Sequence, residues 1–147
     1  MTADSACPFC NIVDGTATAD VAYRDDNVIV FLPDEPATLG HVLVVPTEHV
    51  PDIWSLDART AEAVSRITIR TARAAKAAFQ LDGLNVIQSN GEAATQTVFH
   101  LHVHVVPRYS NDDIAPFWPI GSAVPDADRV RVAGRLAAHI SAGLDDD

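Results

Sequence analysis

Histidine and aliphatic residues alternate strictly over positions 100–105, which read His-Leu-His-Val-His-Val and are followed by Val106, Pro107 and Arg108. Strict alternation is the pattern of a β-strand, whose successive side chains point to opposite faces of a sheet. We therefore expect His100, His102 and His104 on one face, and the aliphatic residues between them against a core. Regular strand pairing should stop near Pro107, which cannot donate a backbone hydrogen bond.

Two kinds of chemistry compete for this row of imidazoles. A His-x-His pair on a strand commonly presents two zinc ligands. Alternatively, one imidazole acts as a nucleophile while its neighbours fix its tautomer and charge. A single histidine on an apolar strand is usually a core residue, but three in strict alternation rarely are. The strand alone leaves the metal site and the nucleophile open.

The bulk composition limits the classes of partner. A chain of 147 residues predicts one domain with its own core. Its net charge of −10 argues against a nucleic-acid or anionic-membrane surface, although local donors can still hold a phosphate. No apolar run approaches the roughly 20 residues of a transmembrane helix, and no secretory signal is seen. Two cysteines do not resemble a secreted disulfide framework, so we expect a cytoplasmic protein.

Cysteines 7 and 10 form a C-x-x-C motif with the sequence Cys-Pro-Phe-Cys. Such a motif can be a redox pair, half of a zinc site, or two unrelated buried thiols. A thioredoxin-type pair normally follows a strand in a βαβ unit, whereas this motif precedes any strong strand. Metal binding is the better hypothesis, provided that two further ligands come from elsewhere in the chain.

The remaining pattern predicts four more strands and two helices. The strands are expected at residues 21–24, 28–32, 41–45 and 84–88. A long amphipathic helix should start at Ser55 or Asp57, run to about Gln80 and be ended by Gly83. A last helix is expected at about residues 126–141. The arginines of the long helix are interpreted as its solvated face rather than as a phosphate patch.

A polar loop at residues 89–97 leads directly into the histidine segment. Its hydroxyl and amide groups could hold an oxyanion, although the alternative is an ordinary hairpin loop. His41, at the start of its strand, could face the same site as the three histidines or lie at the strand edge.

Three of these motifs together resemble the histidine triad (HIT) family, in particular its bacterial Hint- and Fhit-like members. Residues 100–106 match the family signature His-x-His-x-His followed by apolar residues. Residues 90–98 resemble its Asn-Gly-x-x-Ala-Gly-Gln-x-Val loop, and residues 40–46 resemble its Gly-His-x-Leu-Val-x-Pro strand. The combination is much more specific than any single motif.

The resemblance implies an α+β fold, with a five-stranded antiparallel sheet and a long helix and a C-terminal helix packed on it. It implies a single HIT domain over residues 1–147, with a motif-bearing core at about 7–110. Family members usually form homodimers. They hydrolyse or transfer nucleotides at the α-phosphate through a nucleotidyl-histidine. A purine nucleotide substrate is expected, such as a nucleoside phosphoramidate, a dinucleoside polyphosphate or an acylated or sulfated adenylate, with no organic cofactor.

Site roles follow from the same resemblance. His102 corresponds to the catalytic nucleophile. Nucleotide-binding roles fall to Phe9, Ile12, Phe31, Asp34, His41, Asn90, Gln96, Thr97 and His104. Among these, Gln96 and Thr97 would donate to phosphate oxygens, and the aromatic residues with Ile12 would line the base pocket.

Two positions depart from the family pattern. Pro33 stands where many members carry the acidic residue that binds the ribose hydroxyls, and Asp34 follows it. Thr95 replaces the loop glycine before Gln96, where glycine would let the backbone approach the phosphate. Both departures concern the identity of the substrate more than the type of reaction.

The resemblance also implies a structural zinc ion bound by Cys7, Cys10, His49 and His100, a set suited to closed tetrahedral zinc. His102 would then be left free to attack. Two alternatives are kept: a metal-dependent phosphohydrolase that uses the triad as ligands, and a nucleotide-binding module without catalysis.

Overall fold

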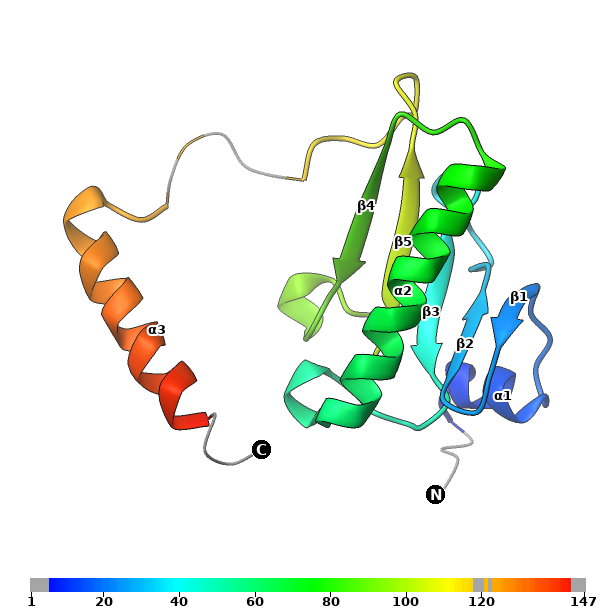
Figure 1. Ribbon diagram of the computed structural model, residues 1–147, viewed down its shortest axis with the longest axis horizontal. Helices are drawn as coiled ribbons and strands as arrows, with labels where there is room; N and C mark the ends of the chain where they lie inside the picture. The colour runs from blue at the N-terminus through cyan, green and yellow to red at the C-terminus, as the bar shows by residue number, and fades with distance from the viewer. Residues whose placement is uncertain (1–5, 118–120, 122, 144–147) are drawn as a thin grey trace. The chain divides into compact units, whose positions relative to one another are not determined.

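The computed structural model describes residues 6–117, 121 and 123–143, and the chain divides after Asp112 into two units (Figure 1). The first unit holds the sheet and most of the helices. Its elements are α1 (Pro8–Asp14), β1 (Val21–Arg24), β2 (Val28–Phe31), β3 (Val42–Pro46), η1 (Ile53–Ser55), α2 (Ala58–Ala78), β4 (Gly83–Gln88), η2 (Glu92–Ala94) and β5 (Val103–Arg108).

The five strands form one antiparallel sheet in the order β1-β2-β3-β5-β4. The expected α+β fold with a five-stranded antiparallel sheet is thus confirmed. The histidine-bearing strand β5 lies between β3 and β4, and His104 stands opposite Leu43 of β3 and Ile87 of β4. A central strand of this kind has fixed neighbours on both sides, so its side chains are held in register.

Both faces of the sheet are covered in its centre. On one face, alternate strand residues such as Val30, Val44 and Val105 pack against α2. On the other, Phe31 and Leu43 pack with α1 (Figure 1). Strands buried on both faces require near-continuous apolar runs, which is what β2 and β3 contain. Only the long helix and the last helix were expected on the sheet, so the cover that α1 gives to the second face was not predicted.

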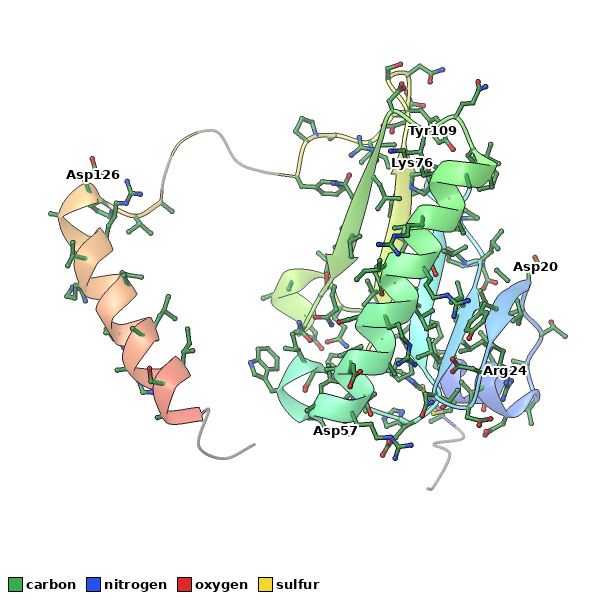
Figure 2. All side chains as sticks on the ribbon, in the orientation of Figure 1. Asp20, Arg24, Asp57, Lys76, Tyr109 and Asp126 are labelled. Atoms are coloured by element: carbon green, nitrogen blue, oxygen red, sulfur yellow. The ribbon has the colours of Figure 1, made fainter. Side chains whose placement is uncertain are left out.

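Helix α2 begins where the sequence predicts but ends earlier. The Asp57 carboxylate caps its first turn by accepting a hydrogen bond of 2.8 Å from the backbone N–H of Thr60. Figure 2 labels Asp57 and Lys76 near the two ends of this helix. The prediction that Gly83 ends the helix is wrong: the helix stops at Ala78, and Gly83 is the first residue of β4.

Helix α1 was not predicted, because seven residues are too few to show a helical period. Its ends nevertheless follow local rules. The Cys7 thiol accepts the backbone N–H of Cys10 at 3.5 Å, and Pro8 occupies the first turn, where its missing N–H costs nothing. Gly15 ends the helix with φ +77°, a conformation that favours glycine.

The histidine segment is only partly a strand. β5 begins at Val103, so His100 and His102 precede it, whereas the sequence predicts all three histidines on the strand. Pairing with both neighbouring strands begins at Val103, which lies opposite Val44 of β3 and Gln88 of β4. Upstream of it the chain is held by a hydrogen bond from the Leu101 N–H to the carbonyl of Val50, at 2.6 Å.

The second unit contains η3 (Asp126–Asp128) and α3 (Arg129–Gly143), close to the predicted last helix. None of the described residues of α3 is buried within this unit. The expected packing of this helix on the sheet stays a prediction, as does the assignment of the whole chain to one domain. Within the described ranges, no helix has both the length and the apolar character that a bilayer span requires.

Candidate active site and metal site

Four histidines and one phenylalanine form a row of rings on the α1 face of the sheet. Successive ring centroids lie 5.2 Å apart from Phe9 to His102, 5.0 Å from His102 to His104, and 5.2 Å from His104 to His41. His100 lies 6.0 Å from the Phe9 ring. His41, His100 and His102 are all buried, so these imidazoles work largely out of bulk water.

The hydrogen bond of His102 fixes which of its nitrogens is reactive. Its Nδ1 lies 2.7 Å from the carbonyl oxygen of His100. A carbonyl only accepts hydrogen bonds, so Nδ1 carries the proton and Nε2 keeps its lone pair. Burial also lowers the pKa of His102, which favours the neutral ring. The arrangement therefore presents a neutral imidazole with a free Nε2.

A chain of hydrogen bonds fixes the tautomer of His104. The backbone N–H of Ala37 donates to Nδ1 of His41 at 2.9 Å, so His41 carries its proton on Nε2. That proton is donated to Nδ1 of His104 at 3.0 Å, which leaves His104 with an N–H at Nε2. Burial, followed by the neighbouring His102 and His41, lowers the pKa of His104 to about 4. His104 is thus a neutral donor at physiological pH.

The third triad histidine faces elsewhere. The Nε2–H of His100 donates to the carbonyl of Pro46 at 2.9 Å, so its Nδ1 lone pair is free. That Nδ1 lies 3.5 Å from the Cys7 sulfur and 3.6 Å from the Cys10 sulfur, and Nδ1 of His49 lies 3.3 Å from the Cys10 sulfur.

These four side chains fit a metal ion. Their ligand atoms all lie within 4.8 Å of one another. Zinc bonds of about 2.3 Å to sulfur and about 2.0–2.1 Å to nitrogen place the two atoms about 3.5–3.6 Å apart in a tetrahedron. The observed sulfur–nitrogen distances of 3.3–3.6 Å match that edge. The carbonyl of Pro46 behind His100 is the kind of partner that orients a metal-binding imidazole.

The loop before the triad is held by Gln96, which is buried. Its side-chain oxygen accepts the Gly91 N–H at 2.7 Å, and its amide nitrogen donates to the carbonyls of Pro51 and Val98 at 2.8 and 3.1 Å. Both amide hydrogens are therefore engaged by backbone, although the resemblance gave them to a phosphate. Asn90 is bonded to the Ile53 N–H at 2.7 Å and to Gln88, whereas Thr97 is exposed.

Thr95 has φ +67°, the left-handed region that a β-branched residue rarely occupies. Glycine adopts this conformation without strain, which explains the glycine in the family motif. Threonine adopts it at a cost in conformational energy.

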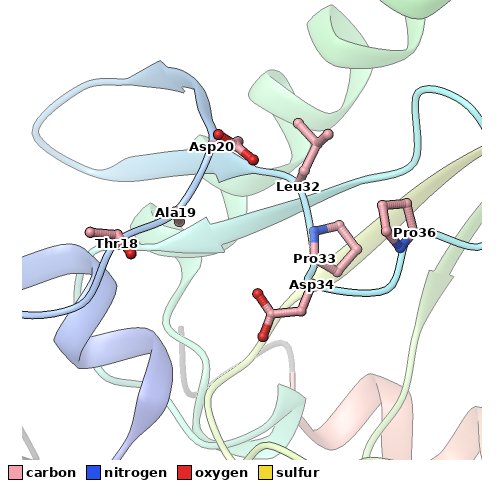
Figure 3. Close-up of a pocket in the computed structure, with 7 residues that line it drawn as sticks. All are labelled: Thr18, Ala19, Asp20, Leu32, Pro33, Asp34 and Pro36. Carbon is pink, nitrogen blue, oxygen red and sulfur yellow. The ribbon is translucent and has the colours of Figure 1, made fainter.

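The residues expected to bind the base and the ribose lie beside the ring row. Ile12 and Phe9 are partly buried against the cluster that contains Phe31. Asp34 borders a hollow of about 380 Å³, shown in Figure 3. The hollow is lined by Thr18, Ala19, Asp20, Leu32, Pro33, Asp34 and Pro36. Since Ala19 also packs on the cluster that contains Phe31, the hollow adjoins the apolar side chains of that cluster.

Sequence reasoning missed the groups that set the tautomers, namely the Ala37 N–H and the carbonyls of Pro46 and His100. They are backbone atoms, so no residue type signals them. The α1 residues, in contrast, carried a signal in Pro8 and Gly15, which bracket the helix.

Comparison with known proteins identifies the family. The HIT domain model matches residues 14–111, two thirds of the chain. The chain belongs to the HIT family. "Protein hit" of Bacillus subtilis (strain 168) is 36% identical over 107 residues, which cover 73% of this chain and 74% of that protein.

Solved structures of HIT proteins agree with this assignment. A HIT family protein from Bacillus anthracis is 37% identical, with a TM-score of 0.84, over 94% of this chain and 99% of the other. A zinc-bound histidine triad family protein from Mycobacterium smegmatis is 39% identical, with a TM-score of 0.70, over 96% of both chains.

Proposed function

We propose that this HIT protein is a nucleotide hydrolase or transferase that acts at the α-phosphate through a covalent intermediate on His102. The observation that carries the proposal is the 2.7 Å hydrogen bond from Nδ1 of His102 to the carbonyl of His100. It leaves Nε2 unprotonated and the ring fixed in direction, which are the two requirements of an imidazole nucleophile.

The chemistry then takes two steps. Nε2 of His102 bonds to the α-phosphorus while the bond from phosphorus to the leaving oxygen or nitrogen breaks. The leaving group takes that electron pair, is stabilised by a hydrogen bond from Nε2–H of His104, and receives its proton from solvent. Water next attacks phosphorus, its proton passes to solvent, and the electron pair of the N–P bond returns to His102. The product is a nucleoside monophosphate.

The His100 carbonyl contributes to the first step. The imidazole becomes cationic when Nε2 bonds to phosphorus, and an N–H donating to a carbonyl oxygen stabilises that charge. His41 acts through His104, because its Nε2–H keeps the acceptor nitrogen of His104 turned away from the substrate.

Binding roles are distributed over the same face. Phe9, Ile12 and Phe31 form an apolar wall for the base, purine by family resemblance. Pro33 stands where many family members carry a ribose-binding carboxylate, and Asp34, which borders the hollow, takes over that role. We assign phosphate contacts to Thr97 and His104, while Gln96 and Asn90 hold the loop that presents them.

Zinc at Cys7, Cys10, His49 and His100 would have a structural role, since four protein ligands close the coordination sphere. The zinc-bound relative from Mycobacterium smegmatis supports this assignment. A homodimer and a cytoplasmic location stay predictions.

The two alternatives differ in specific observations. In a metallohydrolase that used the triad as ligands, several triad nitrogens would converge. Among the described residues, the one group suited to a metal contains His100 without His102 or His104. A binding module without catalysis has no use for an imidazole with an unprotonated Nε2 beside a second imidazole with a fixed Nε2–H, which supports the enzymatic proposal.

Intact-protein mass spectrometry tests the proposal. Mixing the protein with a panel of adenylates, including an adenosine phosphoramidate, should give a transient mass gain of one adenylyl group. His102→Ala should lose both the adduct and turnover. His139→Ala, an exposed histidine in α3, is the matched control and should keep both. Undiminished turnover in His102→Ala would refute the mechanism.

A further inference from the structure

One turn of chain belongs to two neighbouring sites. Cys7 and Cys10 supply the thiols of the metal site, with all ligand atoms within 4.8 Å. Phe9, between them, places its ring edge-on to Phe31 at 5.4 Å and to His102 at 5.2 Å. Any shift of this turn therefore moves the two thiols and the Phe9 ring together.

His100 makes a second connection. Its imidazole is completely buried and has Nδ1 between the two sulfurs, at 3.5 and 3.6 Å. Its carbonyl, on the same residue, accepts the Nδ1–H of His102. Fixing the side chain of His100 thus fixes the backbone atom that orients the nucleophile.

From these two connections we propose that Phe9 and His100 couple the metal site to the nucleotide site, so that zinc and nucleotide bind with positive cooperativity. The inference rests on the proposed function and adds to it a regulatory link. It gives Phe9, which also lines the proposed base pocket, a second role in positioning His102 from the turn that carries the two thiols.

The physical reason is the cost of ordering the turn. Thiols make only weak hydrogen bonds, so without a metal the two cysteines add little to the hold that the packing of Phe9 on Phe31 gives residues 7–10. A nucleotide that packs on Phe9 must then order the turn itself, and its affinity falls by that cost. Four metal bonds order the turn in advance. Linkage requires the converse, that bound nucleotide raises the affinity for zinc by the same factor.

Calorimetry with adenosine monophosphate tests the coupling. We expect zinc-loaded protein to bind adenosine monophosphate about tenfold more tightly than metal-free protein, within the usual range of coupling between sites. Competition with a chromogenic chelator should show the reciprocal gain, about tenfold in zinc affinity at saturating adenosine monophosphate.

Phe9→Leu separates the coupling from the metal site itself. The four ligands remain, so zinc affinity without nucleotide should stay within about twofold of the wild type, while the coupling should fall below about threefold. Phe117→Leu, a half-exposed aromatic residue beyond the stretch matched by the HIT model, is the control and should keep the full coupling.

The outcomes distinguish this proposal from the one on which it rests. Equal affinity for adenosine monophosphate with and without zinc overturns the coupling, while adduct formation on His102 would leave the enzymatic proposal intact. Absence of both binding and adduct overturns the two together. If circular dichroism shows that metal-free protein does not fold, chelator competition on loaded protein decides alone, and zinc release unaffected by adenosine monophosphate overturns the coupling.

Discussion

Gly40 precedes the histidine that orients His104, and its replacement by alanine should be one of the most damaging small changes in the chain. Gly40 has φ +85°, and an added Cβ would lie 2.7 and 2.9 Å from two ring carbons of Phe79 and 3.2 Å from Cγ of Pro107. Carbon atoms pack at about 3.5–4.0 Å, so the Phe79 ring would have to retreat by nearly 1 Å. The Pro107 ring, fully buried in β5, cannot make room.

Two contributions set the magnitude for Gly40→Ala. A left-handed backbone costs an alanine about 1–2 kcal/mol, and overpacking costs about 1–3 kcal/mol. The reduced entropy of the unfolded chain returns about 0.4–1 kcal/mol. The free energy of unfolding should therefore fall by about 2–4 kcal/mol. Gly15→Ala is the matched control, since Gly15 has φ +77° with nothing within 4 Å of an added Cβ. It should cost only the backbone contribution, about 1 kcal/mol.

Urea unfolding of zinc-saturated protein measures both variants under one set of conditions. The same substitution in a Phe79→Ala background removes the main clash, so Gly40→Ala should cost about 1–3 kcal/mol less there than in the wild type. An equal cost for Gly40→Ala and Gly15→Ala, or additive effects in the double variant, would refute the steric reasoning.

Three further predictions follow from the site. Thr95→Gly should raise the free energy of unfolding by about 0.5–1 kcal/mol, because glycine relieves the left-handed strain at that residue; a loss in urea unfolding would contradict this. His104 has a pKa of about 4 when folded, against 6.5 when unfolded, so the unfolded chain takes up protons first and stability drops as the pH falls from 6.5 towards 4. His104→Asn should remove up to about 3 kcal/mol of that pH dependence, and an unaltered slope would count against the low pKa. Purified protein should carry one zinc ion per chain, and Cys10→Ala should lose it in atomic absorption; a variant that retains zinc would disprove the Cys–His set.

The sheet and the long helix could be predicted from the sequence because their signals are local. Alternation and β-branched residues identify the strands, and Asp57 marks the start of α2 through its own cap hydrogen bond. The end of α2 could not be placed, since the stretch from Phe79 to Asp82 has neither a helical cap glycine nor a strand pattern. Gly83, expected to end the helix, instead pairs with Arg108 as the first residue of β4.

The histidine segment shows where periodicity stops being informative. Alternation predicts a strand from His100, but a strand also needs partners. Pairing with β3 and β4 ends at Val103, so the residues before it take other conformations. The C-x-x-C motif also depends on distant residues. It becomes a possible metal site only because His49 and His100, 39 and 90 positions after Cys10, lie beside the thiols.

Three histidines of one motif thus have three different environments, and the difference lies in what each ring nitrogen contacts. The tautomers of His100 and His102 are set by backbone carbonyls, those of Pro46 and His100. Backbone partners move only with the fold, so substitutions of neighbouring side chains leave these two rings in the same protonation pattern. His104 alone takes its tautomer from a side chain, His41, which in turn is set by the Ala37 N–H. The proposed nucleophile and the proposed metal ligand are therefore oriented by backbone carbonyls, whereas the proposed hydrogen-bond donor His104 depends on the loop that ends at Gly40.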